Sequence, residues 1–297
     1  LPFYAGSLGL LYAYLRERTA PRELPIDFAG AITLTGALTC VLVVALEGGK
    51  SLPWGSGALF GTLAVAGVLF LAFGIVERRA ADPVLPFDAL RLRPVAVANL
   101  GNVVVGFANY LPITFVPLLV QGVRGGDALA TGSVLTALGA TWSLTAVVSG
   151  RIYLALGFRK SAIAGTAGIA SGIGIVTGGA MVEATITVLA VGMAIVGWGL
   201  GMSSTAFLYA PQGAVPWNRR AAVTSSTQFA RNVAGAIAVA IAGGWLNGQL
   251  LDDAVARGID PAAAVAAVSH MLSPTERAAV AIDLGQALAV TLGDGLM

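Results

Sequence analysis

Apolar residues occur along this chain in long runs and do not alternate with polar ones. A helix needs about 20 mainly apolar residues to cross the hydrocarbon core of a bilayer. Runs of that length, nearly free of charge, cover 28–46, 58–76, 95–121, 128–149, 161–182, 184–212 and 221–248. Each run is too long for a strand and lacks the alternation that a membrane barrel requires. The pattern predicts an all-α, polytopic membrane helix bundle.

Shorter apolar stretches stand at both ends of the chain. Residues 1–15 have the character of the end of an earlier span, and residues from about 281 that of the start of a last span. The chain begins at Leu1, without an initiator methionine, and stops at Met297 before that last stretch reaches spanning length. We therefore expect a fragment of a longer membrane protein.

Composition supports a membrane protein and excludes several functions. The 297 residues are 57% hydrophobic and 11% charged, whereas soluble domains are about 25% charged, so lipid is the expected solvent. A net charge of +2, from scattered basic residues, does not indicate nucleic-acid binding. The single cysteine, Cys40, and the single histidine, His270, cannot build a metal site, and no nucleophile–base motif is present. We expect neither an enzyme nor a bound cofactor.

The distribution of basic residues between the loops predicts the topology. If the loops after residues 15, 76, 149 and 212 are cytoplasmic, they contain twelve of the 17 basic residues. The other loops contain four, and Arg231 lies within a span. This bias follows the positive-inside rule and predicts a multi-pass protein of the cell (inner) membrane. The long loop 249–280 then lies outside, as a solvated loop with two helical turns or, alternatively, as an amphipathic hairpin.

Polar side chains form a stripe on the 95–121 span. Asn99, Asn102, Gly106 and Asn109 lie within an arc of about 80° on an ideal helix. Unpaired amides are costly in lipid, so this face must meet protein or water. Two interpretations remain open: amides that bind packed helices together, or one wall of a polar cavity.

Two later spans show similar faces. Trp198, Thr205, Tyr209 and Gln212 share one face of the 184–212 span, with Gly201 between them. Their shared face makes them further candidates for the same cavity or its gate.

The 221–248 span carries the only charge within a complete span. Thr224, Gln228, Arg231 and Gly235 share a face. Arg231 lies about 16 Å beyond Arg220 along a helix, which limits snorkelling to the surface. An intramembrane arginine contacts an anion, a carboxylate or helix-end carbonyls in a functional site, or else locks two helices together. Acidic residues occur only near span edges, as Asp27 and Asp283 do, so a proton-carrying carboxylate is expected there or in the missing part.

Four segments, in order, resemble one family. They are 24–30 (LPIDFAG), 77–94 (ERRAADPVLPFDALRLRP), 117–121 (PLLVQ) and 211–235 (PQGAVPWNRRAAVTSSTQFARNVAG), the last being the most specific. Together they resemble the C-terminal part of a major facilitator superfamily transporter of the fourteen-span drug:proton antiporter type. Between the 128–149 and 161–182 spans, the chain also resembles the superfamily's cytoplasmic gating loop, through Gly150, Arg151, Gly157, Arg159 and Lys160. The acid and arginine that relatives carry in that loop are replaced by Leu154 and Ala155.

The resemblance implies two six-helix bundles that rock around a central site. Residues 1–15 would end the sixth span of the missing N-terminal bundle, 16–94 would hold two extra central spans (28–46 and 58–76), and 95–297 would form the C-terminal bundle. The leading hypothesis is proton-coupled efflux of amphipathic small molecules, with the proton gradient as energy source and no cofactor. The partners implied are a small-molecule substrate, the lipid bilayer and the N-terminal bundle of the same chain. The alternatives are an exporter of an anionic metabolite, peptide or siderophore, and a non-transporting sensor or assembly subunit.

Overall fold

The computed structural model describes residues 2–14, 27–48, 52, 55–80, 85 and 87–256. Within them the chain forms α1 (Pro2–Tyr14), α2 (Phe28–Glu47), α3 (Gly57–Glu77), α4 (Phe87–Leu90), α5 (Arg93–Pro117), α6 (Ala128–Met181), α7 (Ile186–Gln212) and α8 (Arg220–Ala256). The π-helical segment η1 (Leu118–Val123) extends α5, and the 3-10 turn η2 (Trp217–Arg219) precedes α8. These described residues contain no strand, and six of their helices are long and apolar enough to cross a membrane. The all-α, multi-pass architecture is therefore confirmed.

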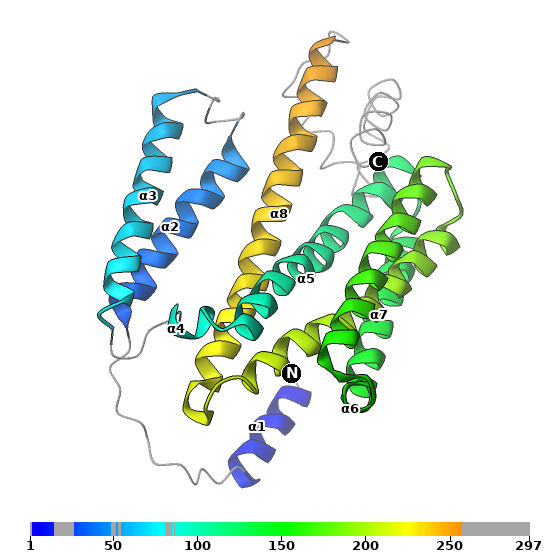
Figure 1. Cartoon of the computed structure of the whole chain (residues 1–297). Helices are drawn as coiled ribbons and strands as arrows, with labels where there is room; N and C mark the ends of the chain where they lie inside the picture. Colours follow the sequence, from blue (N-terminus) through cyan, green and yellow to red (C-terminus); the bar gives the residue numbers. More distant parts are fainter. Residues whose placement is uncertain are drawn as a thin grey trace.

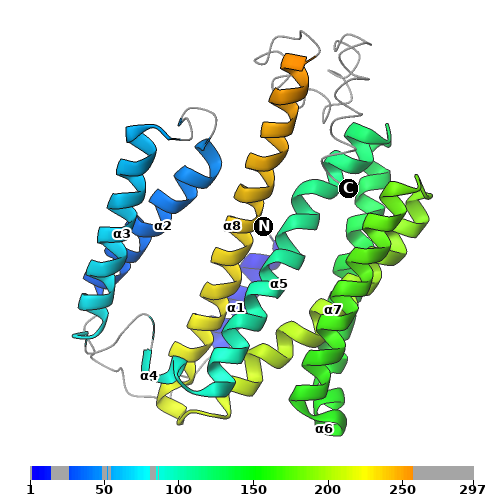
Figure 2. The same ribbon diagram turned by 45° about the horizontal axis from the view of Figure 1, so that its top comes forward.

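Helices α2 and α3 form an antiparallel hairpin beside the rest of the helices (Figure 1). Both begin at a capping side chain: Asp27 Oδ1 accepts a bond from Gly30 N (2.8 Å), and Ser56 Oγ accepts one from Leu59 N (3.2 Å). The hairpin contacts α8, where Gly244 lies against the carbonyl of Ala45. Figure 2 shows α8 between the hairpin and α5 from a second direction. Helices α2 and α3 of the hairpin correspond to the 28–46 and 58–76 apolar runs.

Helix α6 contains most of the 128–149 and 161–182 runs and reverses direction between them. Gly157 has φ 78° and ψ 159°, a backbone conformation outside the helical region that is largely restricted to glycine. The two halves of α6 fold back on each other there (Figure 1). A loop was expected from about 150 to 160, but helical geometry continues on both sides of this single reversal.

Helix α7 packs between the two halves of α6 through small residues. Gly197 faces the carbonyl of Leu138 in the first half, while Gly199 faces the carbonyl of Gly165 in the second half. A Cβ at either glycine would come within 2.5 Å of those oxygens. Small residues allow such close backbone approach, which drives helix association where lipid offers no hydrophobic contrast. The glycine-rich appearance of these spans therefore reflects packing, as the apolar core around Val134, Val196 and Leu200 also indicates.

The last described helix is longer than its apolar run. The 221–248 run was expected to end where the external loop begins at 249, but α8 continues to Ala256. Continuation of α8 takes up the first residues of that loop. The rest of the expected loop, 257–280, and the last span expected from about 281 lie outside the described residues.

Candidate polar site between the helices

The polar faces of α5 and α8 meet at a close helix crossing. A Cβ on Gly106 would come within 2.3 Å of the carbonyl oxygen of Arg231, and one on Gly235 would come within 2.2 Å of the Tyr110 ring. The Tyr110 hydroxyl donates to Oδ1 of Asn232 across the same interface, at 3.4 Å. The Gly106 and Gly235 positions, predicted as members of the two polar faces, thus set the distance between α5 and α8.

The three asparagines of the predicted stripe have different surroundings. Asn99 Nδ2 donates to the carbonyl of Val95 at 2.9 Å and lies 3.5 Å from Ser226 Oγ on α8. Asn102 is only 2% exposed and donates to the carbonyl of Ala98 in its own helix. Asn109 is half-buried, and its Oδ1 has no hydrogen-bond partner. One stripe on α5 therefore contains an interhelical contact, an amide bonded within its helix and an unpaired acceptor.

Arg231 lies half-buried on α8, and its Nε atom is shielded from solvent. Neither a hydrogen bond nor an ion pair joins its guanidinium to another residue in the part of the chain that the structure describes. The structural alternative, an ion pair that locks two helices together, is not seen among these residues. The half-buried Gln228, one turn earlier, likewise forms no side-chain hydrogen bond with another described residue.

The predicted face of α7 divides between two environments. The Gln212 side chain donates to Thr224 Oγ1 at 3.0 Å, which joins the end of α7 to the start of α8. Thr205 donates to the carbonyl of Gly201 within its own helix. Trp198 lies against Gly168 in the second half of α6 and is 41% exposed, and Tyr209 is also exposed.

Tyr153 is a polar contact that sequence reasoning missed. It is buried on α6, and its hydroxyl donates to the carbonyl of Met202 on α7 at 2.7 Å. Its position at the edge of an apolar run, in what was expected to be a loop, gave no indication of this contact.

The residues of the predicted gating loop lie around the reversal in α6. Arg151, Arg159 and Lys160 are exposed, and a Cβ on Gly150 would meet no atom within 4 Å. None of these side chains forms a hydrogen bond or ion pair with another described residue. The described structure thus shows a basic, open surface at this turn.

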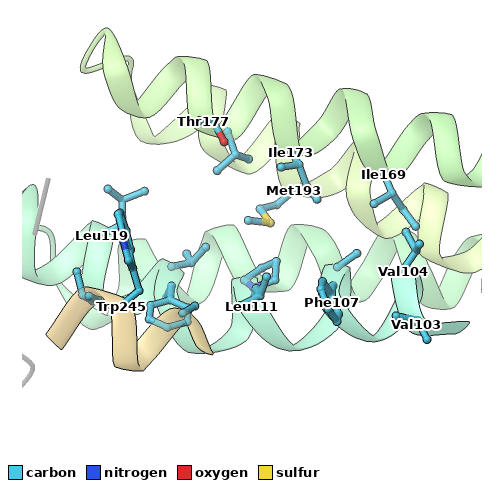
Figure 3. Close-up of a pocket in the computed structure, with 17 residues that line it drawn as sticks. Val103, Val104, Phe107, Leu111, Leu119, Ile169, Ile173, Thr177, Met193 and Trp245 are labelled. Carbon is cyan, nitrogen blue, oxygen red and sulfur yellow. The ribbon is translucent and has the colours of Figure 1, made fainter. Parts of the chain in front are cut away.

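A cavity of about 520 Å³ lies next to the polar crossing, between α5, the second half of α6, α7 and α8. Figure 3 shows Phe107 and Leu111 of α5 facing Ile173 and Thr177 of α6, with Trp245 of α8 nearby. Its lining among the described residues contains no charged side chain, and Thr177 is its polar member. The residues of the three predicted polar faces do not line it. An apolar lining is indistinguishable in sequence from a lipid-facing surface, so no pattern indicated this cavity.

A second cavity, of about 420 Å³, lies beside the first and is lined mainly by α5 and α8. Val103 and Phe107 line both cavities, while Asn99 and Ser226 supply the polar atoms of this one. Asn99 is thus the one predicted site residue that faces a described cavity. No group of three or more metal-binding side chains occurs in the described ranges.

The helices and cavities define a polytopic membrane protein with apolar, drug-sized spaces between its helices. No family model matches the chain. The chain is 28% identical to the "Multidrug transporter protein MdtP" of Bacillus subtilis strain 168, over 82% of this chain and 45% of that protein. It is 30% identical to "Multidrug resistance protein 3" of the same organism, over 82% of this chain and 47% of that protein. It is 27% identical to the "MFS-type efflux pump elcC" of Phaeosphaeria nodorum, over 84% of this chain and 46% of that protein.

These similarities support the resemblance of the motifs to the major facilitator superfamily of membrane transporters. The chain spans about half the length of the curated relatives it matches. The relatives' names describe transport and drug resistance, in agreement with the expectation that the chain is not an enzyme.

Proposed function

We propose that this chain is part of a secondary transporter that exports amphipathic small molecules across the cell membrane by alternating access. The observation that carries the proposal is the similarity to multidrug transporters and an efflux pump over more than four fifths of the chain. Among the three hypotheses from the sequence, those names favour drug efflux over an anion exporter or a non-transporting subunit.

The chemistry of the larger cavity supports this substrate class. Its volume of about 520 Å³ lies within the range that holds drug-sized ligands. Aliphatic side chains with Phe107 and Trp245 favour apolar and aromatic groups without fixing their orientation, which suits a broad substrate range. The neighbouring amide and arginine positions, Asn99, Asn109 and Arg231, offer polar contacts for the other end of an amphipathic molecule.

Proton coupling and orientation form part of the same proposal. The proton gradient supplies the energy, and the loops after residues 15, 76, 149 and 212 face the cytoplasm, as the positive-inside rule predicts. The exposed Arg151, Arg159 and Lys160 then lie on the cytoplasmic side, where a basic surface is common in membrane proteins.

The proposal is tested by dye efflux in everted vesicles that contain the complete protein expressed from its gene. Acidifying the vesicle interior should drive dye uptake into the vesicles, and a protonophore should abolish it. Vesicles with the same amount of the Arg231→Ala variant provide a matched comparison. Uptake that is unchanged by the protonophore would contradict proton coupling, and no gradient-dependent uptake of any of several amphipathic dyes would contradict the proposal itself.

A further inference from the structure

Two carboxyl groups meet at the end of the α2–α3 hairpin, away from the polar crossing of α5 and α8. Asp27 precedes α2, and Glu77 is the last residue of α3. Both Asp27 Oδ2 and Glu77 Oε2 lie within 3.0 Å of the point that a Cβ on Gly30 would occupy. The two oxygens are therefore within about 5 Å of each other, a distance at which like charges alter each other's protonation.

Each carboxyl group has one oxygen that is bonded and one that is not. Asp27 Oδ1 accepts from Gly30 N at 2.8 Å, and Glu77 Oε1 accepts from the backbone N–H of Leu85. The remaining oxygens, Asp27 Oδ2 and Glu77 Oε2, are buried and have no hydrogen-bond partner. Glu77 is only 3% exposed, so water does not compensate for the missing partner. The two unsatisfied acceptors thus lie close together, and no donor among the described residues reaches either of them.

No described cation compensates for the two acids. Neither carboxyl group forms an ion pair with another described residue. Arg78 and Arg79 follow Glu77 but are exposed, and α2 and α3 contain no other charged side chain except Glu47, at the opposite end of α2. Helix α8 contacts the hairpin near Ala45, also at that opposite end. Two adjacent, buried, ionised carboxylates without a counter-charge are strongly unfavourable.

We propose that Asp27 and Glu77 form a carboxyl pair that binds one shared proton and thereby holds the start of α2 against the end of α3. The proton bonds covalently to one of the two free oxygens and is donated in a hydrogen bond to the other. This supplies the missing donor and lowers the pair's charge from two to one. Two free oxygens suffice for a proton but fall short of the six or more oxygen ligands that hard metal cations take.

The pair lies where the hairpin joins the remaining helices. The Leu85 N–H that bonds to Glu77 belongs to the connection between α3 and α4, and the Phe73 ring of α3 contacts the Phe87 ring of α4, with centroids 6.2 Å apart. Leu85 also lines the smaller cavity, beside Asn99. Loss of the shared proton is therefore expected to loosen this junction first. The inference rests on these contacts alone and does not require the proposed function.

The test is an infrared pH titration of the complete protein in lipid nanodiscs, following the C=O band of protonated carboxyl groups. Wild-type protein should keep one protonated carboxyl at neutral pH that is lost at higher pH, and Glu77→Gln should remove that band. Asp27→Asn should move its loss to lower pH by at least about one pH unit, because the like charge is gone. The matched control Asp88→Asn, at an exposed acid of α4, should change neither feature.

Three outcomes of the titration would overturn the proposal. They are a wild-type protein without such a band, an Asp27→Asn variant whose titration equals that of wild type, and a band that disappears when choline is replaced by sodium, which would indicate a cation in place of the proton. Thermal unfolding guards against misfolded variants. Amides imitate the protonated acid, so Glu77→Gln should fold and should lose less stability than wild type as the pH rises. A Glu77→Gln variant with the wild-type dependence on pH would also count against the pair.

Discussion

Gly106 of α5 lies directly against the backbone carbonyl of Arg231 of α8, because a Cβ on this glycine would come within 2.3 Å of that oxygen. The same crossing holds the Tyr110 ring against Gly235. The backbones of α5 and α8 therefore approach as closely as small residues allow. Any larger side chain at position 106 must push the two helices apart.

We expect Gly106→Ala to destabilise the folded protein by about 1–3 kcal/mol, the usual cost of overpacking a close contact. Thermal unfolding of purified protein in detergent, followed by size-exclusion chromatography, measures the change. Gly174→Ala is the matched control, since a Cβ there would meet no atom within 4 Å. Equal unfolding temperatures for the two variants would show that α5 and α8 are not in this close contact.

The reversal in α6 leads to a second prediction about glycine. Gly157 has φ 78° and ψ 159°, a region in which other residues cost about 1–3 kcal/mol, whereas Gly150 nearby has no positive φ. Gly157→Ala should therefore lower the unfolding temperature, and Gly150→Ala should leave it unchanged or raise it. The cost of an alanine at position 157 comes from its backbone conformation and not from a clash, because a Cβ there would meet no atom within 4 Å. If both variants unfold at the wild-type temperature, the two halves of α6 do not turn at Gly157.

The apolar cavity predicts a change in substrate preference. Phe107 of α5 lines both described cavities, so Phe107→Ala should weaken the binding of aromatic dyes about three- to tenfold, as expected for the loss of an aromatic contact. Binding to the purified complete protein is measured by dye fluorescence. Phe60→Ala on α3 is the control, because Phe60 is exposed and lines neither cavity. Unchanged dye affinity in Phe107→Ala would place the dye elsewhere in the protein.

Run length and helical spacing predicted much of this architecture. The 28–46 run forms helix α2 (Phe28–Glu47), because an apolar stretch of that length satisfies its backbone hydrogen bonds in lipid only as a spanning helix. Spacing also placed Gly106 and Gly235 on the faces that now meet, since residues at such intervals share a helix face whatever the neighbour is. These predictions depend on local geometry, which the sequence determines directly.

Run length and helical spacing do not predict contacts between segments that are far apart in the sequence. The sequence placed Asp27 near a span edge, but its approach to Glu77 depends on how closely two helices pair. Arg124, expected in an outside loop, donates to the carbonyl of Gly179 in the last turn of α6 and to that of Ala184 just after this helix. No helical spacing indicates either contact, because the fold brings together residues that are about 50 or more positions apart in the sequence.

Arg231 provides the sharpest test of the candidate site. Its guanidinium has no hydrogen-bond or ion-pair partner among the described residues, so Arg231→Ala leaves no described acid without its counter-charge. The variant should therefore be present in the membrane in the same amount as the wild-type protein. If the arginine contacts the substrate or a gate, the same variant should lose most of its proton-driven dye efflux in everted vesicles. Arg231→Lys keeps the charge but not the planar donors, and should retain part of the activity. Arg151→Ala, at an exposed position on the α6 reversal, controls for the loss of a positive charge. Full efflux by Arg231→Ala would exclude a role in the cavity or gate, and loss of the protein itself would show that Arg231 is structural.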